Sequence, residues 1–257
     1  MGVAGLLWLL CQKGQAERKF FFSGFLICSV AACLIGRYLA QHYFVVLLPA
    51  ISLLAGLAVP AFAGLLARTR FPPLRFLPAG LFIGVCAGLV HQNGAVWFEL
   101  PPAVASAAIY FNCPFVECLE IGRFIREHSA PRDRLAVVGS EPEIYFYAQR
   151  RSVSGYIYMY DLVEPQPYAR AMQQEFIHDV ETAKPEFLVV VNTGTSWMTW
   201  ADADPALFNW IRRYPGSGYD LVGVAEIYPS HTEYRWGREA AAEERKTDNA
   251  IFTFKRK

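Results

Sequence analysis

Long apolar runs fill the first hundred residues and constrain this chain more than any other feature of its sequence. Three of them, at about residues 20–36, 43–66 and 77–98, approach or exceed the ~20 residues with which an α-helix crosses a bilayer. The chain is 54% hydrophobic and 18% charged, whereas soluble proteins carry about 25% charged residues. The sequence therefore predicts an α-helical transmembrane bundle over residues 1–98, in which residues 1–11 are the last part of a further membrane helix.

Basic residues orient these spans. The loops at 12–19 and 67–76 each carry three Lys or Arg, and both lie on the same side of the membrane when the spans alternate. The turn at 37–42 carries only Arg37. Since cytoplasmic loops collect Lys and Arg, both basic loops are expected inside. We expect a multi-pass protein of the cytoplasmic (inner) membrane, with residues 37–42 and everything after residue 98 on the extracytoplasmic side.

The pattern changes after a linker at residues 99–115. From residue 116 to 257, helix-like periodicity alternates with short apolar runs, which is typical of an α/β domain with a three-layer sheet. The continuous apolar run at 187–191 favours a parallel strand covered on both faces. Helices are expected at 116–129, 141–149, 165–183 and 205–214, and strands at 134–139, 152–156, 187–191, 219–228 and 250–255.

Several common chemistries lack their motifs here. The sequence has no phosphate-binding Gly-rich loop and no Gly-x-Ser-x-Gly, HExxH or CxxC motif. The five histidines are too scattered for a metal site, so neither a metal nor a cofactor is expected. A net charge of +1 gives no indication of nucleic-acid binding. Cys113 and Cys118 are the cysteines outside the apolar spans, and the sequence leaves open whether they form a disulfide.

Ser140 and Glu141 follow the predicted strand at 134–139. Open α/β sheets bind ligands beyond the carboxyl ends of their strands, so these two side chains are candidate ligand contacts. The alternative is a helix N-cap at Ser140, completed by Glu143 as a capping box. The sequence favours the cap.

An aromatic cluster surrounds a pair of arginines further along the chain. Tyr145 and Tyr156 flank Arg150 and Arg151, and together they are candidates for an acceptor or ligand surface. Aromatic rings beside arginines suit carbohydrate stacking and cation–π contacts. They equally suit contact with a membrane surface or ordinary packing in the protein core.

Arg37, His42 and Tyr43 are the candidate residues at the predicted outer membrane surface. The guanidinium fork of an arginine matches phosphate oxygens, and a histidine can donate or carry a proton. These residues are therefore a candidate site for the phosphate of a membrane-bound donor. The alternative is that Arg37 and His42 only anchor the helix ends at the interface, and the residues alone favour that alternative.

Two stretches resemble one protein family. Arg37-Tyr-Leu-Ala-Gln-His-Tyr-Phe44, continuing to Leu47-Leu-Pro-Ala50, is similar to a late membrane segment of bacterial glycosyltransferase family 39, which is related to protein O-mannosyltransferases and has the GT-C fold. The second stretch resembles the extracytoplasmic domain of a bacterial subgroup of this family. It comprises Gly139-Ser-Glu-Pro-Glu-Ile-Tyr-Phe-Tyr147, Arg150-Arg-Ser152, Gly155-Tyr-Ile-Tyr158 and Glu164-Pro-Gln-Pro-Tyr168.

The resemblance implies transfer of a sugar from a polyprenyl-phosphate carrier to an acceptor outside the cytoplasm. The family's catalytic carboxylate lies in a first extracytoplasmic loop that has no counterpart in this sequence, so the resemblance implies no catalytic residue here. The chain is expected to be the C-terminal portion of such an enzyme, inactive alone, with the bilayer, the lipid-linked donor and the enzyme's N-terminal portion as partners. The alternative is a non-enzymatic, membrane-anchored extracytoplasmic protein that binds a glycan or a protein partner.

Overall fold

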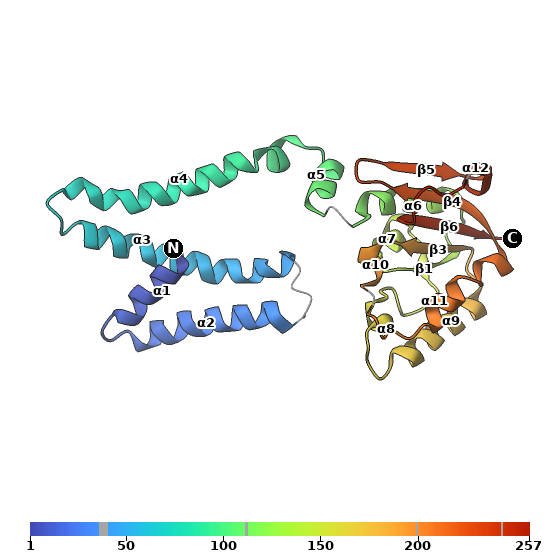
Figure 1. Ribbon diagram of the computed structural model, residues 1–257, viewed down its shortest axis with the longest axis horizontal. Coiled ribbons are helices and arrows are strands. Elements are labelled where there is room, and N and C mark those ends of the chain that lie inside the picture. The colour runs from blue at the N-terminus through green and yellow to red at the C-terminus, as the bar shows by residue number, and fades with distance from the viewer. Residues whose placement is uncertain (36–40, 111–112, 199, 243) are drawn as a thin grey trace. The chain divides into compact units, whose positions relative to one another are not determined.

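The computed structural model describes residues 1–35, 41–110, 113–198, 200–242 and 244–257. The chain forms two compact units, Met1–Phe98 and Glu99–Lys257, each with its own internal packing (Figure 1). The first unit is helical and apolar, and the second contains a β-sheet with helices.

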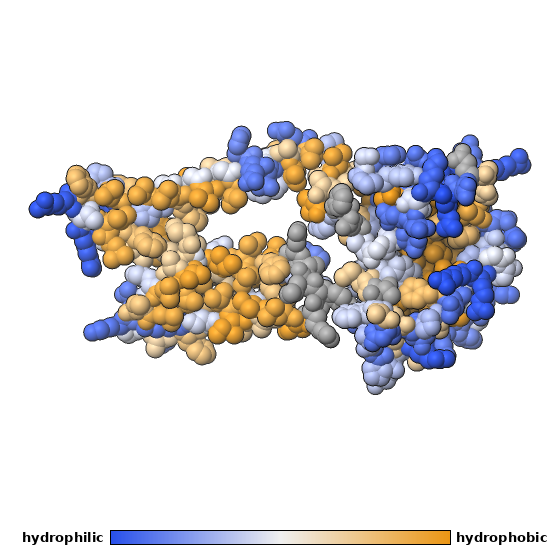
Figure 2. Space-filling view, in the orientation of Figure 1, coloured by the Kyte–Doolittle hydropathy of each residue, from blue (hydrophilic) through white to orange (hydrophobic). Residues whose placement is uncertain are grey.

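The first unit contains three helical segments that are long and apolar enough to cross a membrane: Ala16–Ile35, His42–Leu66 and Pro72–Gln92. Many of their large apolar side chains are exposed, and apolar residues dominate the face of this unit that Figure 2 shows. The third span is predicted at 77–98 but lies at Pro72–Gln92, so it begins and ends earlier in the chain than expected. The described elements are α1 (Gly2–Cys11), α2 (Ala16–Ile35), η1 (Gln41–Leu47), α3 (Leu48–Leu66), η2 (Pro72–Phe76), α4 (Leu77–Gln92) and η3 (Ala95–Glu99).

Close packing of α1 on α3 forms the interior of the helical unit. A Cβ atom on Gly5 would lie only 1.8 Å from the carbonyl oxygen of Leu54, so a glycine is required where the two backbones meet. Leu9, Leu54 and Ala58 are buried around this contact. Small residues that let helix backbones approach closely are typical of helix pairs in membranes.

The second unit is built on a mixed six-stranded sheet with the order β2-β1-β3-β6-β4-β5. Strands β1, β2 and β3 are parallel, whereas β6 runs antiparallel to both β3 and β4, and β5 runs antiparallel to β4. The strands are β1 (Arg134–Val138), β2 (Arg151–Ser152), β3 (Phe187–Asn192), β4 (Tyr219–Ile227), β5 (Thr232–Trp236) and β6 (Ala250–Arg256).

Helices cover both faces of this sheet, which confirms the predicted three layers. Phe187, Val189 and Val191 of β3 face α6 and α7, whereas Leu188 and Val190 face α8, α9 and α11. This alternation explains why the strand reads as a continuous apolar run. The helices are α5 (Pro102–Ile109), α6 (Phe115–Glu127), α7 (Glu143–Ala148), α8 (Tyr160–Val163), α9 (Ala169–Ala183), α10 (Gly194–Trp197), α11 (Ala206–Ile211), η4 (Pro215–Ser217) and α12 (Arg238–Ala242).

Some individual elements of the second unit differ from the sequence expectation. The predicted linker at 99–115 contains helix α5, and the predicted strand at 152–156 is reduced to the two-residue β2. Strand β5 was not predicted, because its sequence Thr-Glu-Tyr-Arg-Trp contains no apolar run. It lies at the edge of the sheet, where one strand neighbour suffices and polar side chains are tolerated.

Candidate functional site

The carboxyl ends of β1 and β3 bring Ser140 and Glu141 next to Ser196. The Ser196 hydroxyl donates a hydrogen bond to Glu141 Oε2 (2.8 Å) and accepts one from the Ser140 N–H (3.0 Å). Gly139 makes room for this arrangement, since a Cβ there would lie 2.4 Å from Glu141 Oε2 and 2.8 Å from Ser196 Oγ. The sequence placed Ser140 and Glu141 at this end of the sheet but carried no signal for Ser196.

Glu141 is a buried acid with an unusual protonation equilibrium. The residue is only 3% exposed. Burial raises the pKa of the carboxyl group to about 8, and the nearby charge of Glu143 adds to the rise, while the hydrogen bond from Ser196 opposes it. Ser196 is fully buried as well. At neutral pH, Glu141 is therefore largely protonated and, with Ser196, is closed off from solvent.

The predicted capping box is wrong. Helix α7 begins at Glu143 with Pro142 as its N-cap, and no side chain caps its first turn. The Ser140 hydroxyl accepts a hydrogen bond from the Met159 N–H instead (3.1 Å). Ser140 thus ties the β1–α7 connection to the segment that leads into α8, because that neighbouring backbone donor lies within reach.

Cys113 and Cys118 are both free thiols, so the disulfide that the sequence left open is absent. Cys118 lies on the inner face of α6, where it is fully buried in the core against the sheet. Burial and then the charges of Glu143 and Glu141 raise the pKa of its thiol well above its usual value. Cys118 therefore acts as a small core residue.

Arg150 contributes to the interior of the domain rather than to its surface. It is buried, and its guanidinium donates five hydrogen bonds to Ser129 Oγ and to the carbonyl oxygens of Arg126, Ser129, Ala148 and Gln149. Helix α6 ends at Glu127 and α7 ends at Ala148, so this one side chain satisfies carbonyl groups at the C-terminal ends of two helices.

The other members of the predicted ligand surface are dispersed. Arg151 is exposed on β2, the strand at the edge of the sheet. The Tyr145 hydroxyl accepts a hydrogen bond from the Val137 N–H (2.8 Å). The Tyr156 hydroxyl donates one to Glu175 (2.7 Å), and this bond raises the pKa of Tyr156 to about 12. Tyr145 and Tyr156 each have a partner within the protein.

His42 and Tyr43 lie on η1, directly before α3. Their rings meet edge to face, with centroids 4.5 Å apart, and His42 is exposed. The carbonyl oxygen of Tyr43 accepts a hydrogen bond from Cys33 Sγ of α2 (3.3 Å). Arg37, the third residue of the predicted phosphate site, lies outside the described residues.

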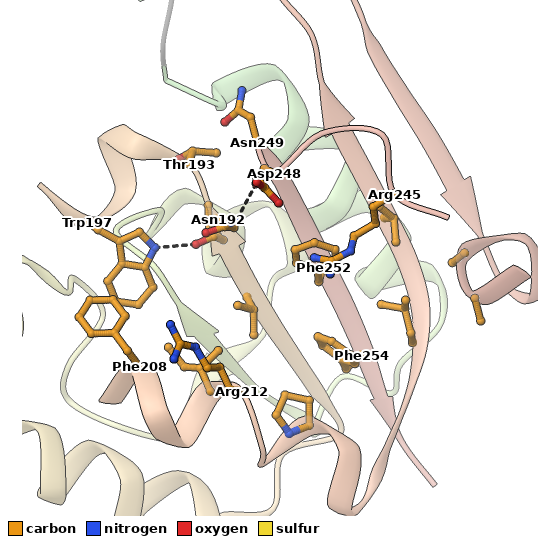
Figure 3. A pocket seen from close by; sticks show the side chains of 18 of the residues that line it. Asn192, Thr193, Trp197, Phe208, Arg212, Arg245, Asp248, Asn249, Phe252 and Phe254 are labelled. Atoms are coloured by element: carbon orange, nitrogen blue, oxygen red, sulfur yellow. Dashed lines mark hydrogen bonds between the residues drawn. The ribbon is translucent and has the colours of Figure 1, made fainter. Parts of the chain in front are cut away.

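A cavity of about 1090 Å³ opens on the sheet face that α11 and α12 flank (Figure 3). Its apolar floor is formed by strand residues that include Val190, Leu221, Phe252 and Phe254. Trp197 and Phe208 line one side, with ring centroids 5.0 Å apart, and Arg245 lies on the other. This volume lies just above the range of about 300–1,000 Å³ that is usual for pockets that bind small organic ligands.

Polar side chains surround the mouth of this cavity: Asn192, Arg212, Glu244, Arg245, Asp248 and Asn249. The Arg245 guanidinium lies 5.4 Å from the centroid of the Phe252 ring. Within the described residues, no hydrogen bond or ion pair engages the side chains of Glu244 or Asp248, or links Arg212 or Arg245 to a carboxylate. These four charged groups are therefore available to a ligand.

A buried ion pair holds the cavity wall in place. Glu226 Oε2 lies 2.7 Å from the Arg235 guanidinium, and Glu226 Oε1 accepts hydrogen bonds from the N–H groups of Lys246 (2.7 Å) and Thr247 (3.4 Å). Burial alone would raise the pKa of Glu226, but these hydrogen bonds and the charge of Arg235 lower it. The ionised carboxylate thus fixes the segment that carries Arg245 and Asp248.

The sequence did not predict this cavity, because its lining comes from separate stretches between residues 190 and 254. The charged stretch at 238–248, which begins with α12, contributes to the lining, but charged stretches are more often ordinary solvent-exposed segments. Among the described residues, no cluster of His, Cys, Asp and Glu side chains is suited to hold a metal ion.

No protein-family model, curated protein sequence or solved structure matches this chain.

Proposed function

We propose that this chain is a portion of an integral-membrane glycosyltransferase, which transfers a sugar from a polyprenyl-phosphate-linked donor to an acceptor outside the cytoplasm. The observation that carries the proposal is one chain with three helices of membrane-spanning length and composition, followed by an α/β domain. The resemblance of residues 37–50 and 139–168 to glycosyltransferase family 39 supplies the donor class.

The basic loops support the direction of insertion. Lys13, Arg18 and Lys19 precede or open the span Ala16–Ile35, and Arg68 and Arg70 follow the span His42–Leu66. Because such clusters remain cytoplasmic, the segment around His42 and the α/β domain would lie on the extracytoplasmic side of the inner membrane.

The donor phosphate is the ligand that we assign to Arg37, His42 and Tyr43. A phosphate group carries negative charge and several acceptor oxygens, which an arginine can bind through two parallel hydrogen bonds. His42 is exposed directly at the start of a span, where a headgroup would be reached. The phosphate would then contact the polar residues at positions 37–43, and the first units of the polyprenyl chain would contact the apolar residues of the span that follows.

Photolabelling in proteoliposomes tests this assignment. A photoreactive polyprenyl-phosphate sugar is expected to crosslink to the segment 37–47, and Arg37→Ala is expected to reduce labelling about tenfold, since a hydrogen bond to a charged group contributes about 1.5–3 kcal/mol. The matched control is Arg68→Ala, which removes an arginine from a loop on the opposite side. Equal labelling of the Arg37 and Arg68 variants would remove Arg37 from the site. Absence of labelling at segment 37–47 in the unsubstituted chain would reject the lipid-linked donor.

A non-enzymatic glycan- or partner-binding protein is the second candidate. It is favoured by the α/β domain itself, where Glu141 and Ser196 are sealed from solvent while a large cavity is open. The two candidates differ in one result. Binding of a ligand to the domain in a chain that shows no donor labelling would support the second candidate over the first.

A further inference from the structure

Aromatic, amide and charged side chains line the cavity on the α11–α12 face of the sheet. We propose that it binds an uncharged oligosaccharide, with sugar rings against its aromatic wall and hydroxyl groups toward its polar mouth. This inference rests on the proposed function and deepens it, because it names the class of acceptor and the place where the acceptor is held.

The balance of positive and negative side chains in the cavity lining favours an uncharged oligosaccharide over an anionic ligand. The charged lining residues are Arg212 and Arg245 against Glu244 and Asp248, so their formal charges sum to zero. A site for phosphate or sulfate would collect donors without adjacent carboxylates, which repel an anion. Sugar hydroxyls both donate and accept, and they use a mixture of guanidinium, carboxylate and amide groups equally well.

The aromatic and apolar lining favours an oligosaccharide over a small polar solute as the ligand. Trp197, Phe208, Phe252 and Phe254 all line the cavity (Figure 3), and Trp197 and Phe252 also belong to the domain core, with 8% and 9% of their surface exposed. The faces of sugar rings carry C–H groups that pack on such surfaces. The indole N–H of Trp197 is already used on the carbonyl oxygen of Val191 (2.7 Å), which fixes the orientation of that ring.

Hydrogen bonds within the protein hold the mouth of the cavity in place. Asn192 Nδ2 donates to the carbonyl oxygen of Asp248 (2.5 Å), and Asn249 Nδ2 donates to that of Ile227 (3.2 Å). The mouth is therefore tied to β3 and β4 before any ligand arrives, and no hydrogen bond within the described part of the chain uses the Oδ1 atom of either asparagine. A tied mouth loses little conformational entropy on binding, which a weakly held, uncharged ligand requires.

The test uses the full chain in lipid nanodiscs, because detergents with sugar headgroups would compete for the cavity. Mannotriose and triacetylchitotriose are titrated at millimolar concentration, with saturation-transfer NMR and intrinsic tryptophan fluorescence as readouts. We expect saturable binding of at least one trisaccharide, with an affinity that changes little with salt because the ligand carries no charge. Dodecanoate serves as the apolar, anionic comparison.

Matched variants locate the binding. Ala241→Trp places a ring in the cavity from α12, whereas Ala242→Trp adds the same ring at an exposed position of that helix outside the lining. We expect Ala241→Trp and Arg245→Ala each to weaken trisaccharide binding about tenfold, and Ala242→Trp and Arg151→Ala to leave it unchanged.

Three results would overturn the inference: no saturable binding of either trisaccharide, preferential binding of dodecanoate, or loss of binding in Arg151→Ala without loss in Arg245→Ala. Failure of the proposed function is distinguishable from these results. It would appear as absent donor labelling at segment 37–47, whereas trisaccharide binding is read out in the α/β domain.

Discussion

Replacing Arg150 with alanine is expected to destabilise the α/β domain by about 3 kcal/mol or more, because several buried acceptors lose their donor at once. The carbonyl groups involved belong to the C-terminal ends of α6 and α7, where no helical N–H is available to replace the guanidinium. For a domain of this size the loss corresponds to a thermal midpoint lower by about 10 °C. Tryptophan fluorescence of the full chain in nanodiscs measures it.

Arg151 provides the matched control for this prediction. It is the next residue, with the same side chain, but it is exposed on β2. Arg151→Ala is expected to change stability by less than about 0.5 kcal/mol, as surface substitutions usually do. Similar midpoints for the Arg150 and Arg151 variants would contradict the structural role of Arg150 and return it to the candidate ligand surface.

Glu141→Gln is expected to remove a pH dependence from the stability of the domain. The folded pKa of Glu141 is raised to about 8, so between about pH 4.5 and pH 8 the folded state binds a proton that the unfolded state has released. Stability must therefore fall as the pH rises through this window. From about pH 4 to pH 7 the loss from Glu141 is about 3 kcal/mol, and glutamine, which can still accept the Ser196 hydrogen bond, avoids it.

Thermal unfolding at a series of pH values measures this difference. The Glu141→Gln variant is expected to exceed the wild-type protein in stability at about pH 7 and to converge with it near pH 4. Glu120→Gln is the control, since Glu120 lies on the surface in a pair with Arg123. If the Glu141→Gln variant follows the wild-type curve at every pH, Glu141 ionises freely in the folded domain and its raised pKa is refuted.

Much of the α/β domain could be predicted from apolar runs, and the exceptions have physical causes. Strands β1, β3, β4 and β6 are central in the sheet and buried, so each leaves an apolar stretch in the sequence. The edge strand β5 is half exposed and leaves none. The order of the strands and the antiparallel insertion of β6 depend on contacts between distant residues, for which one sequence carries no local signal.

The candidate site was predictable in part for the same reason. Ser140 and Glu141 follow a recognisable strand, but their partner Ser196 lies 55 residues beyond Glu141. Arg150 stands among tyrosines in the sequence, a pattern that suits a ligand surface as well as packing in the core. Its burial depends on two helices ending next to each other, which the sequence does not reveal. The cavity needs several separate segments at once and left no pattern at all.

Every functional proposal for this chain requires the α/β domain to lie outside the cytoplasm, and cysteine labelling tests that requirement directly. In a chain whose six cysteines are replaced by alanine, single cysteines are introduced as Gln12→Cys, Thr69→Cys and Ser230→Cys. A membrane-impermeant maleimide applied to intact spheroplasts is expected to label position 230 alone, with positions 12 and 69 labelled only after permeabilisation. Labelling of positions 12 and 69 but not 230 in intact spheroplasts, or recovery of the chain outside the membrane fraction, would contradict the account.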